Sequence, residues 1–421
     1  MKRIMLTFAA IFSIGMTNIY AQTDPMGEPR YEVFKTKSEP VYRIPAIATT
    51  WKGNLIAVAD YRYGLKDIGF GSVELHRRVS KDNGKTWGNV VEFTHGQYVT
   101  SPKPKYDAAY GDPCIVADRT SSRIMVISCS GNTGFPYGTR EVHQGITRFY
   151  SYDEGETWSE PVNLESMFYG LLDKSTKGPI RSMFIGSGKI FQSRTVQIGK
   201  YYRLYCSGIV KDVNGVNCDY VYYSDDFGET WQVLGDINTP AIASGDEPKA
   251  EELPDGSVLC SARVGGGRKF NIFTFTNARK AEGKWATDAF SGEKNNGVIA
   301  PGCNGEIMIV PVIRNSDNKK MHLALHSTPA STKSRTDVGI FYKELDGKKD
   351  YSSPEVFASN WTGFHKSTTL PSAYSTFTLM SNGHIGLLYE ETTYNGLEYT
   401  IVFKDYSIED ITDGKYRYNF S

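Results

Sequence analysis

The sequence predicts an all-β protein folded as a six-bladed β-propeller. Its main signal is an octapeptide of pattern S-x-D-x-G-x-T-W, which begins at Ser80, Ser151 and Ser224, with starts 71 and 73 residues apart. Runs that alternate apolar and polar residues precede and separate the copies, as at 73–79 and 201–205, and such period-two runs are typical of strands. A repeat of about 70 residues divides roughly 400 mature residues into five to six units with room for four strands each, and radial repetition of four-stranded sheets is the propeller arrangement. We expect six blades.

Each octapeptide is expected to form a tight hairpin turn. Its Asp can accept hydrogen bonds from the amides of its own turn, its Gly can adopt a positive φ, and its Trp can pack over the turn. Weaker copies are expected at 276–285, which keeps a Gly and a Trp, and near 337–347. These residues are predicted to be structural rather than catalytic.

The amino-terminal residues are typical of a secretory signal peptide. Two basic residues precede an apolar run over 4–16, which is shorter than the roughly 20 residues that span a bilayer, and a small residue, Ala21, ends the segment. We therefore expect 1–21 to be removed on export to the periplasm or the outside of the cell. Because no long Pro- or Ser-rich linker interrupts the rest, 22–421 is predicted to be a single propeller domain.

The charge balance excludes binding modes that depend on bulk electrostatics. The chain carries 47 basic and 47 acidic side chains, so it lacks the basic excess that holds nucleic acid or an anionic membrane. An anionic ligand therefore has to be bound by a few placed cations. We expect the protein to have no nucleic-acid partner and no membrane span. We also expect it to be a monomer.

The cysteines leave two possibilities open. In an exported chain they can pair, and Cys206 and Cys218 flank a turn signal, Asn214-Gly215, that a disulfide can close; buried free thiols are the alternative. No C-x-x-C pair or H-E-x-x-H motif occurs, so the sequence predicts neither a metal site nor a redox site.

The segment Tyr42-Arg43-Ile44-Pro45 begins the first predicted blade, ahead of the first octapeptide. It resembles the Arg-Ile-Pro motif of the exo-α-sialidases, glycoside hydrolase family 33, and the octapeptide resembles their Asp box. In that family the arginine belongs to a triad that binds the sialic acid carboxylate, so the resemblance implies this role for Arg43. It extends over nearly the whole mature chain.

Further segments of the first two blades resemble the family in the same order. Asp67 follows Arg43 by 24 residues and matches the general acid/base, which the family places in a loop at this separation. Arg62 resembles a further substrate-binding arginine. Asp112 resembles an aspartate that contacts a sugar hydroxyl.

The second half of the chain resembles the rest of the family's site. Glu247 matches the glutamate that activates the nucleophile, and Arg263 matches the second arginine of the triad, with Arg268 as a weaker rival. Arg335 matches the third arginine. Tyr374, just before a predicted strand, matches the nucleophile.

One more match concerns the support of the arginine triad. Glu390, in Leu388-Tyr389-Glu390, resembles the glutamate that holds the first arginine in place, which is Arg43 here.

The resemblance implies an exo-α-sialidase that acts on sialylated glycoproteins, glycolipids or oligosaccharides by a retaining mechanism, with no metal or organic cofactor. Because residues 22–42 are the only mature residues before Arg43, we expect a catalytic propeller without a separate glycan-binding module. Three alternatives stay open at this point: a hydrolase for another 2-keto acid sugar such as Kdn or Kdo, a glycan-binding propeller without catalysis, and transfer or an intramolecular product in place of hydrolysis.

Overall fold

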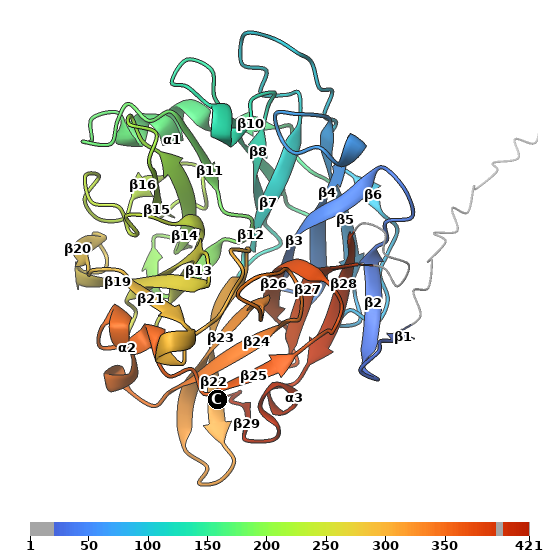
Figure 1. The fold of residues 1–421 in the computed structure, drawn as a ribbon, viewed down its shortest axis with the longest axis vertical. Coiled ribbons are helices and arrows are strands. Elements are labelled where there is room, and N and C mark those ends of the chain that lie inside the picture. Colours follow the sequence, from blue (N-terminus) through green and yellow to red (C-terminus); the bar gives the residue numbers. More distant parts are fainter. Residues whose placement is uncertain (1–20, 393–398, 421) are drawn as a thin grey trace, which may run out of the picture.

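The computed structural model describes residues 21–392 and 399–420, and six sheets, antiparallel except for one short pairing, are arranged around a common axis (Figure 1). This arrangement confirms the predicted six-bladed propeller. The predicted signal peptide, 1–21, lies outside the described residues except for Ala21.

Each blade has three or four main strands, and several blades carry one short extra strand. Blade 1 contains β3 (Val41–Thr49), β4 (Leu55–Arg62), β5 (Val73–Ser80) and β6 (Val91–Glu92). Blade 2 contains β12 (Gly188–Lys189), β7 (Tyr110–Ala117), β8 (Ile124–Ser130), β9 (Gly145–Ser151) and β10 (Val162–Asn163). Blade 3 contains β11 (Ser182–Ile185), β13 (Phe191–Ile198), β14 (Tyr201–Lys211), β15 (Asn217–Ser224) and β16 (Gln232–Val233).

The second half of the ring follows the same plan. Blade 4 contains β17 (Asp246–Glu252), β18 (Val258–Val264), β19 (Gly267–Asn277), β20 (Glu282–Trp285) and β21 (Ala289–Gly292). Blade 5 contains β29 (Tyr416–Tyr418), β22 (Glu306–Arg314), β23 (Lys320–Pro329), β24 (Val338–Leu345) and β25 (Gly363–Lys366). Blade 6 contains β26 (Ser372–Leu379), β27 (Ile385–Thr392), β28 (Tyr399–Tyr406), β2 (Pro29–Phe34) and β1 (Gln22–Thr23).

Short helices lie between the strands. The α-helices are α1 (Glu165–Leu172), α2 (Pro354–Ala358) and α3 (Ile408–Thr412). The 3-10 helices are η1 (Tyr63–Leu65), η2 (Phe135–Tyr137), η3 (Glu293–Asn295) and η4 (Lys348–Tyr351). Among the described residues, no helix is long and apolar enough to cross a membrane.

The amino-terminal strands close the ring within blade 6, while the last strand, β29, belongs to blade 5. β2 pairs antiparallel with β28, with Tyr31 opposite Phe403, so the amino-terminal strand completes the sheet that the carboxy-terminal strands begin. This pairing covers strand edges that would otherwise expose unpaired backbone groups.

The strand nearest the axis is split in blade 3. β11 and β13 both pair with β14, at opposite ends of it. Between them, β12 crosses to blade 2 and pairs parallel with β7, with Gly188 opposite Cys114. The crossing joins blades 2 and 3 beside the axis.

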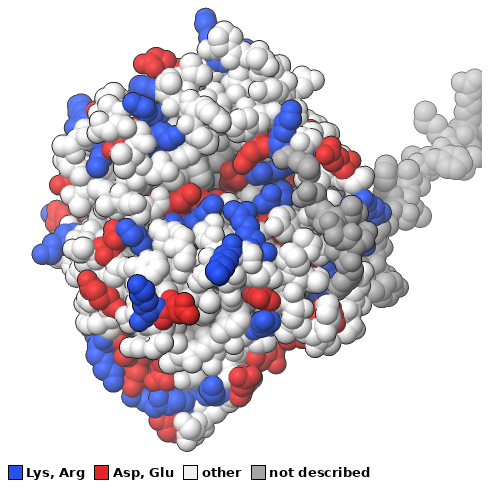
Figure 2. All heavy atoms as spheres, viewed as in Figure 1, with Lys and Arg blue, Asp and Glu red and all other residues white. Residues whose placement is uncertain are grey.

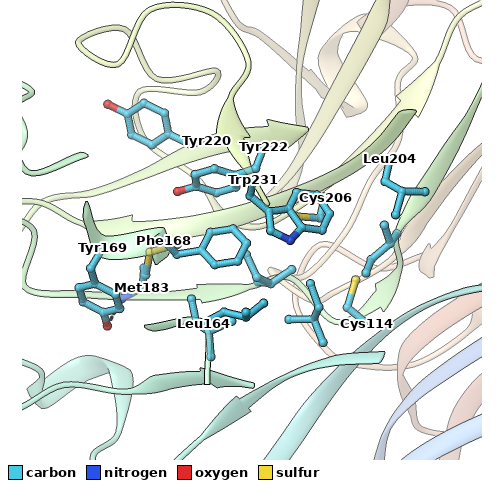
Figure 3. Packing of buried hydrophobic residues seen from close by; sticks show 14 of the residues in the cluster. Cys114, Leu164, Phe168, Tyr169, Met183, Leu204, Cys206, Tyr220, Tyr222 and Trp231 are labelled. Atoms are coloured by element: carbon cyan, nitrogen blue, oxygen red, sulfur yellow. Dashed lines mark hydrogen bonds between the residues drawn. The ribbon is translucent and has the colours of Figure 1, made fainter. Parts of the chain in front are cut away.

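Large apolar side chains fill the space between neighbouring blades. Between blades 2 and 3, Phe168 of α1 packs edge-on against Tyr222 with ring centroids 5.2 Å apart, and Trp231 lies against the same group (Figure 3). Burial of such side chains removes apolar surface from water, which is the main favourable contribution to folding.

The three octapeptides form one and the same turn. In the third, the Ser224 hydroxyl donates to Asp226 Oδ1 at 2.8 Å, and the Thr230 amide and hydroxyl donate to the Asp226 carboxylate at 2.9 and 2.6 Å. Gly228 has a φ of 84°, and a Cβ there would lie 2.2 Å from Met125 Sδ of blade 2. Glycine is therefore required by both the turn and the contact with the preceding blade.

We expect Asp226→Ala to lower the free energy of unfolding by about 1–2 kcal/mol, because it removes three hydrogen bonds from a partly exposed turn. Burial raises the pKa of Asp226, but the bonds from Thr230 and Ser224 outweigh it and hold the pKa below 3.8. A lowered folded-state pKa stabilises the fold above the unfolded value of about 4, and this stabilisation is lost as the pH falls further.

Denaturant unfolding of Asp226→Ala and wild type at pH 7 and below pH 4 measures this contribution. The free energy of unfolding of wild type is expected to exceed that of Asp226→Ala by the full value of about 1–2 kcal/mol at pH 7 and by less below pH 4. Asp107→Ala, at an exposed position, is the control and is expected to unfold like wild type; an equal loss in both variants would contradict the prediction.

All six cysteines are buried free thiols. The register of β14 and β15 places Cys206 opposite Tyr222 and Cys218 opposite Val210, so the two cysteines are four positions apart along the hairpin. At about 3.3 Å per residue this is roughly 13 Å, about twice the Cα separation that a disulfide allows. Of the two alternatives that the sequence left open, the free thiols are the correct one.

Candidate active site

A cavity of about 360 Å³ lies at one end of the axis, and every blade contributes to it. Blades 1 to 6 contribute, in order, Arg43, Asp112, Phe184, Glu247, Arg335 and Tyr374. Figure 2 looks onto a face of the molecule where basic and acidic side chains meet around a hollow near the centre. Seven residues predicted from the sequence line the cavity besides Tyr374: Arg43, Arg62, Asp67, Asp112, Glu247, Arg263 and Arg335.

Backbone bulges in three inner strands place side chains at the cavity. Ile44, Asp112 and Glu247 have φ angles of 53°, 51° and 37°, and each precedes a proline where the register with the next strand shifts. A left-handed backbone is costly for these residue types, above all for β-branched Ile44. Because proline has no amide hydrogen, the interrupted strand pairing leaves no unpaired backbone donor at the proline.

Tyr374 and Glu247 form a short hydrogen-bonded pair in the cavity. The Tyr374 hydroxyl donates to Glu247 Oε1 at 2.5 Å, and Arg263 Nη1 lies 2.7 Å from Glu247 Oε2 and 3.2 Å from the Tyr374 oxygen. Burial, together with the Glu247 charge, raises the pKa of Tyr374 well above 10. The phenol is therefore neutral at rest, with its proton directed at a carboxylate.

Glu390 holds Arg43 in place beside Tyr374. Its buried carboxylate accepts hydrogen bonds from Arg43 Nε at 2.7 Å, from the Ile44 amide at 2.8 Å and from the Tyr374 amide at 3.1 Å. The Glu390 carboxylate thus links the inner strand of blade 1 to the inner strand of blade 6, and Glu390 follows Arg43 by 347 positions in the sequence.

Three guanidinium groups converge on Tyr374. The Arg43 and Arg335 guanidinium carbons lie 5.8 and 5.5 Å from the centre of the Tyr374 ring, and Arg263 contacts its hydroxyl. Arg335 makes no side-chain hydrogen bond or ion pair with the described residues, so its fork is available to a ligand. Arg268, the rival of Arg263, is fully buried and donates to the Cys303 carbonyl at 3.0 Å, away from the cavity lining.

On the opposite wall, three carboxyl groups surround Arg62. Its Nη2 lies 2.8 Å from Asp60, 3.1 Å from Asp67 and 3.3 Å from Asp112. Burial raises the pKa of Asp60 to about 7 against the effect of Arg62, and burial followed by the charges of Asp67 and Asp60 raises the pKa of Asp112 well above 3.8. With three carboxyl groups sharing one guanidinium, a proton on one of them is favoured. Asp67 is the exposed member, with 57% of its side chain accessible.

Asp60 is a residue of this site that the sequence reasoning did not assign. It is fully buried, holds Arg62 by two bonds and accepts from the Asp112 amide at 2.8 Å. Its position two residues before Arg62 on β4, on the same face of the strand, was the available signal.

An apolar wall beside Asp67 was also not expected from the sequence. It consists of side chains from blades 1, 2 and 3: Ile68, Phe70, Phe135 and Phe184. Phe135 and Phe184 meet edge to face at 5.1 Å. The cavity thus combines two charged groups, around Tyr374 and around Arg62, with an apolar wall suited to carbon-rich parts of a ligand.

We expect Glu390→Gln to lower the free energy of unfolding by about 2–3 kcal/mol and to weaken any function of Arg43, because the Arg43 guanidinium, with 19% of its side chain accessible, loses its counter-charge and a charge-assisted hydrogen bond. Glu391→Gln is a matched control. Glu391 is the next residue on β27, equally buried, and pairs with Arg30 at 2.8 Å. Thermal unfolding and ligand binding are measured for both; equal loss of binding in the two variants would contradict a specific role for Glu390.

The repeats belong to a known family. The BNR/Asp-box repeat matches residues 149–160 and 222–233, which contain the whole of the second and third octapeptides. The first octapeptide forms the same turn, with the Thr86 amide donating to Asp82 at 2.8 Å.

Bacterial sialidases are similar to this chain in sequence. A sialidase of Micromonospora viridifaciens is 28% identical over 407 residues, which cover 90% of this chain and 55% of that protein. A sialidase of Bacteroides fragilis is 25% identical over 392 residues, which cover 86% of this chain and 62% of that protein. The chain therefore spans about half to three fifths of the length of these two relatives.

Solved structures share the fold. The Hadza microbial sialidase Hz136 has a TM-score of 0.70 at 22% identity, covering 91% of this chain and 69% of that one. The intramolecular trans-sialidase from Ruminococcus gnavus has a TM-score of 0.70 at 18% identity, covering 93% and 99%. By its Asp-box repeats, its curated relatives and its six-bladed fold, this chain is related to the bacterial sialidases, and glycoside hydrolase family 33 is consistent with all three.

Proposed function

We propose that the protein is an exported exo-α-sialidase that hydrolyses terminal α-linked sialic acid from glycoproteins, glycolipids or oligosaccharides, as a monomer and with retention of configuration. The observation that carries the proposal is the Tyr374 hydroxyl at 2.5 Å from Glu247 with Arg43, Arg263 and Arg335 around it. The sialidases among the relatives support the substrate class.

Three arginines suit a sugar with a carboxylate on its anomeric carbon. A guanidinium stays charged and presents a planar fork that a carboxylate accepts bidentately. In this proposal Arg43, Arg263 and Arg335 bind that carboxylate. A chain of zero formal charge can then hold an anionic sugar locally.

The same substrate carboxylate favours a neutral nucleophile. A carboxylate attacking beside it would meet like-charge repulsion, and sialidases are known exceptions that use tyrosine. We propose that Tyr374 attacks the anomeric carbon while Glu247 takes its proton, so that negative charge reaches the carbon only during attack.

Asp67 is the proposed general acid and base. It protonates the departing glycosidic oxygen in the first step, which forms the glycosyl–Tyr374 bond and breaks the bond to the leaving group. It then takes a proton from water, which attacks the anomeric carbon as the bond to Tyr374 breaks, and Glu247 returns its proton to the Tyr374 oxygen. Arg62 and Asp112 are the proposed contacts to the sugar.

Product analysis tests the proposed activity against its rivals. Purified protein is incubated with α2,3- and α2,6-sialyllactose and with Kdn and Kdo glycosides, and the products are identified by NMR and mass spectrometry. Free sialic acid, first released as the α-anomer, is expected. Release of Kdn or Kdo only, an anhydro sugar as the main product, or binding without turnover would each refute the proposal.

A further inference from the structure

A group of possible metal ligands lies on blade 1, outside the cavity. Glu74 and His76 are on β5 and point to the same face because they are two residues apart. Glu92 on β6 is directly opposite His76, and His95 follows three residues later. Oxygen and nitrogen atoms of Glu74, Glu92 and His95 all lie within 4.8 Å of one another.

The two carboxylates have no permanent cation beside them. Among the described residues, the salt-bridge partners of Glu74 and Glu92 are histidines only, His76 and His95. Glu74 is largely buried, with 12% of its side chain accessible. Burial, followed by the charge of Glu92, raises the pKa of Glu74. A bound cation would offset both the cost of burying the Glu74 charge and the repulsion between Glu74 and Glu92.

His76 supplies a second and independent observation. Only 9% of its side chain is accessible, and its Nε2 has no hydrogen-bond partner in the described part of the chain, although it lies 3.7 Å from Glu74 Oε2. The other ring nitrogen, Nδ1, is 3.0 Å from the Tyr42 hydroxyl, and the ring stacks on Tyr61 at 4.4 Å. A histidine whose far nitrogen is held by a hydrogen bond while the near nitrogen faces a carboxylate, that of Glu74, has the arrangement of a metal ligand.

We propose that Glu74, Glu92, His95 and His76 form a binding site for a divalent transition-metal ion of the zinc type. Two imidazoles with two carboxylates suit tetrahedral zinc, whereas calcium and magnesium prefer oxygen ligands alone. The sequence predicted no metal site because these ligands do not form a linear zinc motif. They come from β5, from β6 and from the loop after β6, and only the pairing of the two strands brings them together.

The site is placed to steady the elements that carry the cavity residues. The Tyr63 hydroxyl donates to Glu74 Oε2 at 3.2 Å, and Tyr63 begins η1, which leads to Asp67. Tyr42, bonded to His76, precedes Arg43. A metal that binds only the folded chain raises the free energy of unfolding by RT ln(1 + [metal]/Kd). Zinc is therefore expected to raise the Tm.

Titration of the metal-free mature chain with Zn²⁺ tests the site. We expect one equivalent to bind by calorimetry, Co²⁺ to give the visible absorption of a tetrahedral site, and Zn²⁺ to raise the Tm. His95→Ala changes a side chain that is 88% accessible, so folding is retained, and it is expected to weaken Zn²⁺ binding at least about tenfold. Glu92→Gln is expected to do the same.

His384→Ala is the matched control. It removes another accessible imidazole that contacts a carboxylate, Asp405, at 2.7 Å, and Zn²⁺ binding is expected to be unchanged. No stoichiometric Zn²⁺ binding, binding of Ca²⁺ in preference to Zn²⁺, or equal weakening in His95→Ala and His384→Ala would overturn the proposal. None of these readouts depends on glycosidase activity.

Discussion

Tyr374→Phe is expected to lower kcat on sialosides at least about 10³-fold, because the variant keeps the ring but has no oxygen to form the glycosyl–enzyme bond. Binding of a sialic acid analogue is expected to change much less, since the three arginines stay in place. Initial rates on a fluorogenic sialoside and calorimetric binding of the analogue measure the two effects.

Covalent trapping tests directly whether the Tyr374 oxygen forms the bond to the sugar. Wild type incubated with 2,3-difluorosialic acid is expected to gain one sugar on the peptide that contains Tyr374, and Tyr374→Phe is expected to gain none. Tyr406→Phe is the control, because it removes another hydroxyl–carboxylate bond, to Glu28 at 2.7 Å, in the outer part of blade 6. Normal turnover by Tyr374→Phe, or trapping on another residue, would reject the nucleophile.

Asp67→Asn is expected to lower kcat/KM on sialyllactose by about 10²–10⁴-fold, since general acid catalysis supplies a factor of this size. The loss is expected to shrink strongly on an aryl sialoside, whose phenol leaves without needing a proton. A dependence on the leaving group separates proton donation from simple damage to the cavity.

The control for Asp67→Asn is the same change at Asp107, an exposed aspartate on the loop before β7. Rates on sialyllactose and on the aryl sialoside are compared for both variants. An equal loss on the two substrates in Asp67→Asn would show that Asp67 acts on binding or folding and not on the leaving group.

The blades could be predicted from local patterns because each turn makes its own hydrogen bonds. Ser224, Asp226 and Thr230 bond one another within seven residues, so their spacing in the sequence describes the turn directly. The split inner strand of blade 3 could not be predicted in this way, since β12 leaves its own blade to pair with β7.

The bulged prolines carried a signal that the sequence reasoning used only in part. Ile44-Pro45, Asp112-Pro113 and Glu247-Pro248 are separated by 68 and 135 residues, which is about one and two blades. They mark equivalent positions of three inner strands, and two of the three residues before proline, Asp112 and Glu247, line the cavity as predicted site residues.

The sequence by itself determined the repeated hairpin of the blades and the order of the site motifs, because both are contained in short segments. The length of the chain allowed five or six blades, and the structure has the six that we expected. The tertiary structure decided which charged groups meet. It distinguished Arg263 in the cavity from Arg268 behind it, although the two are directly opposite in register. It also added Asp60 beside Arg62 and brought Glu390 to Arg43. Such contacts join strands up to 347 positions apart, and their distances depend on how six sheets pack around one axis rather than on any local pattern.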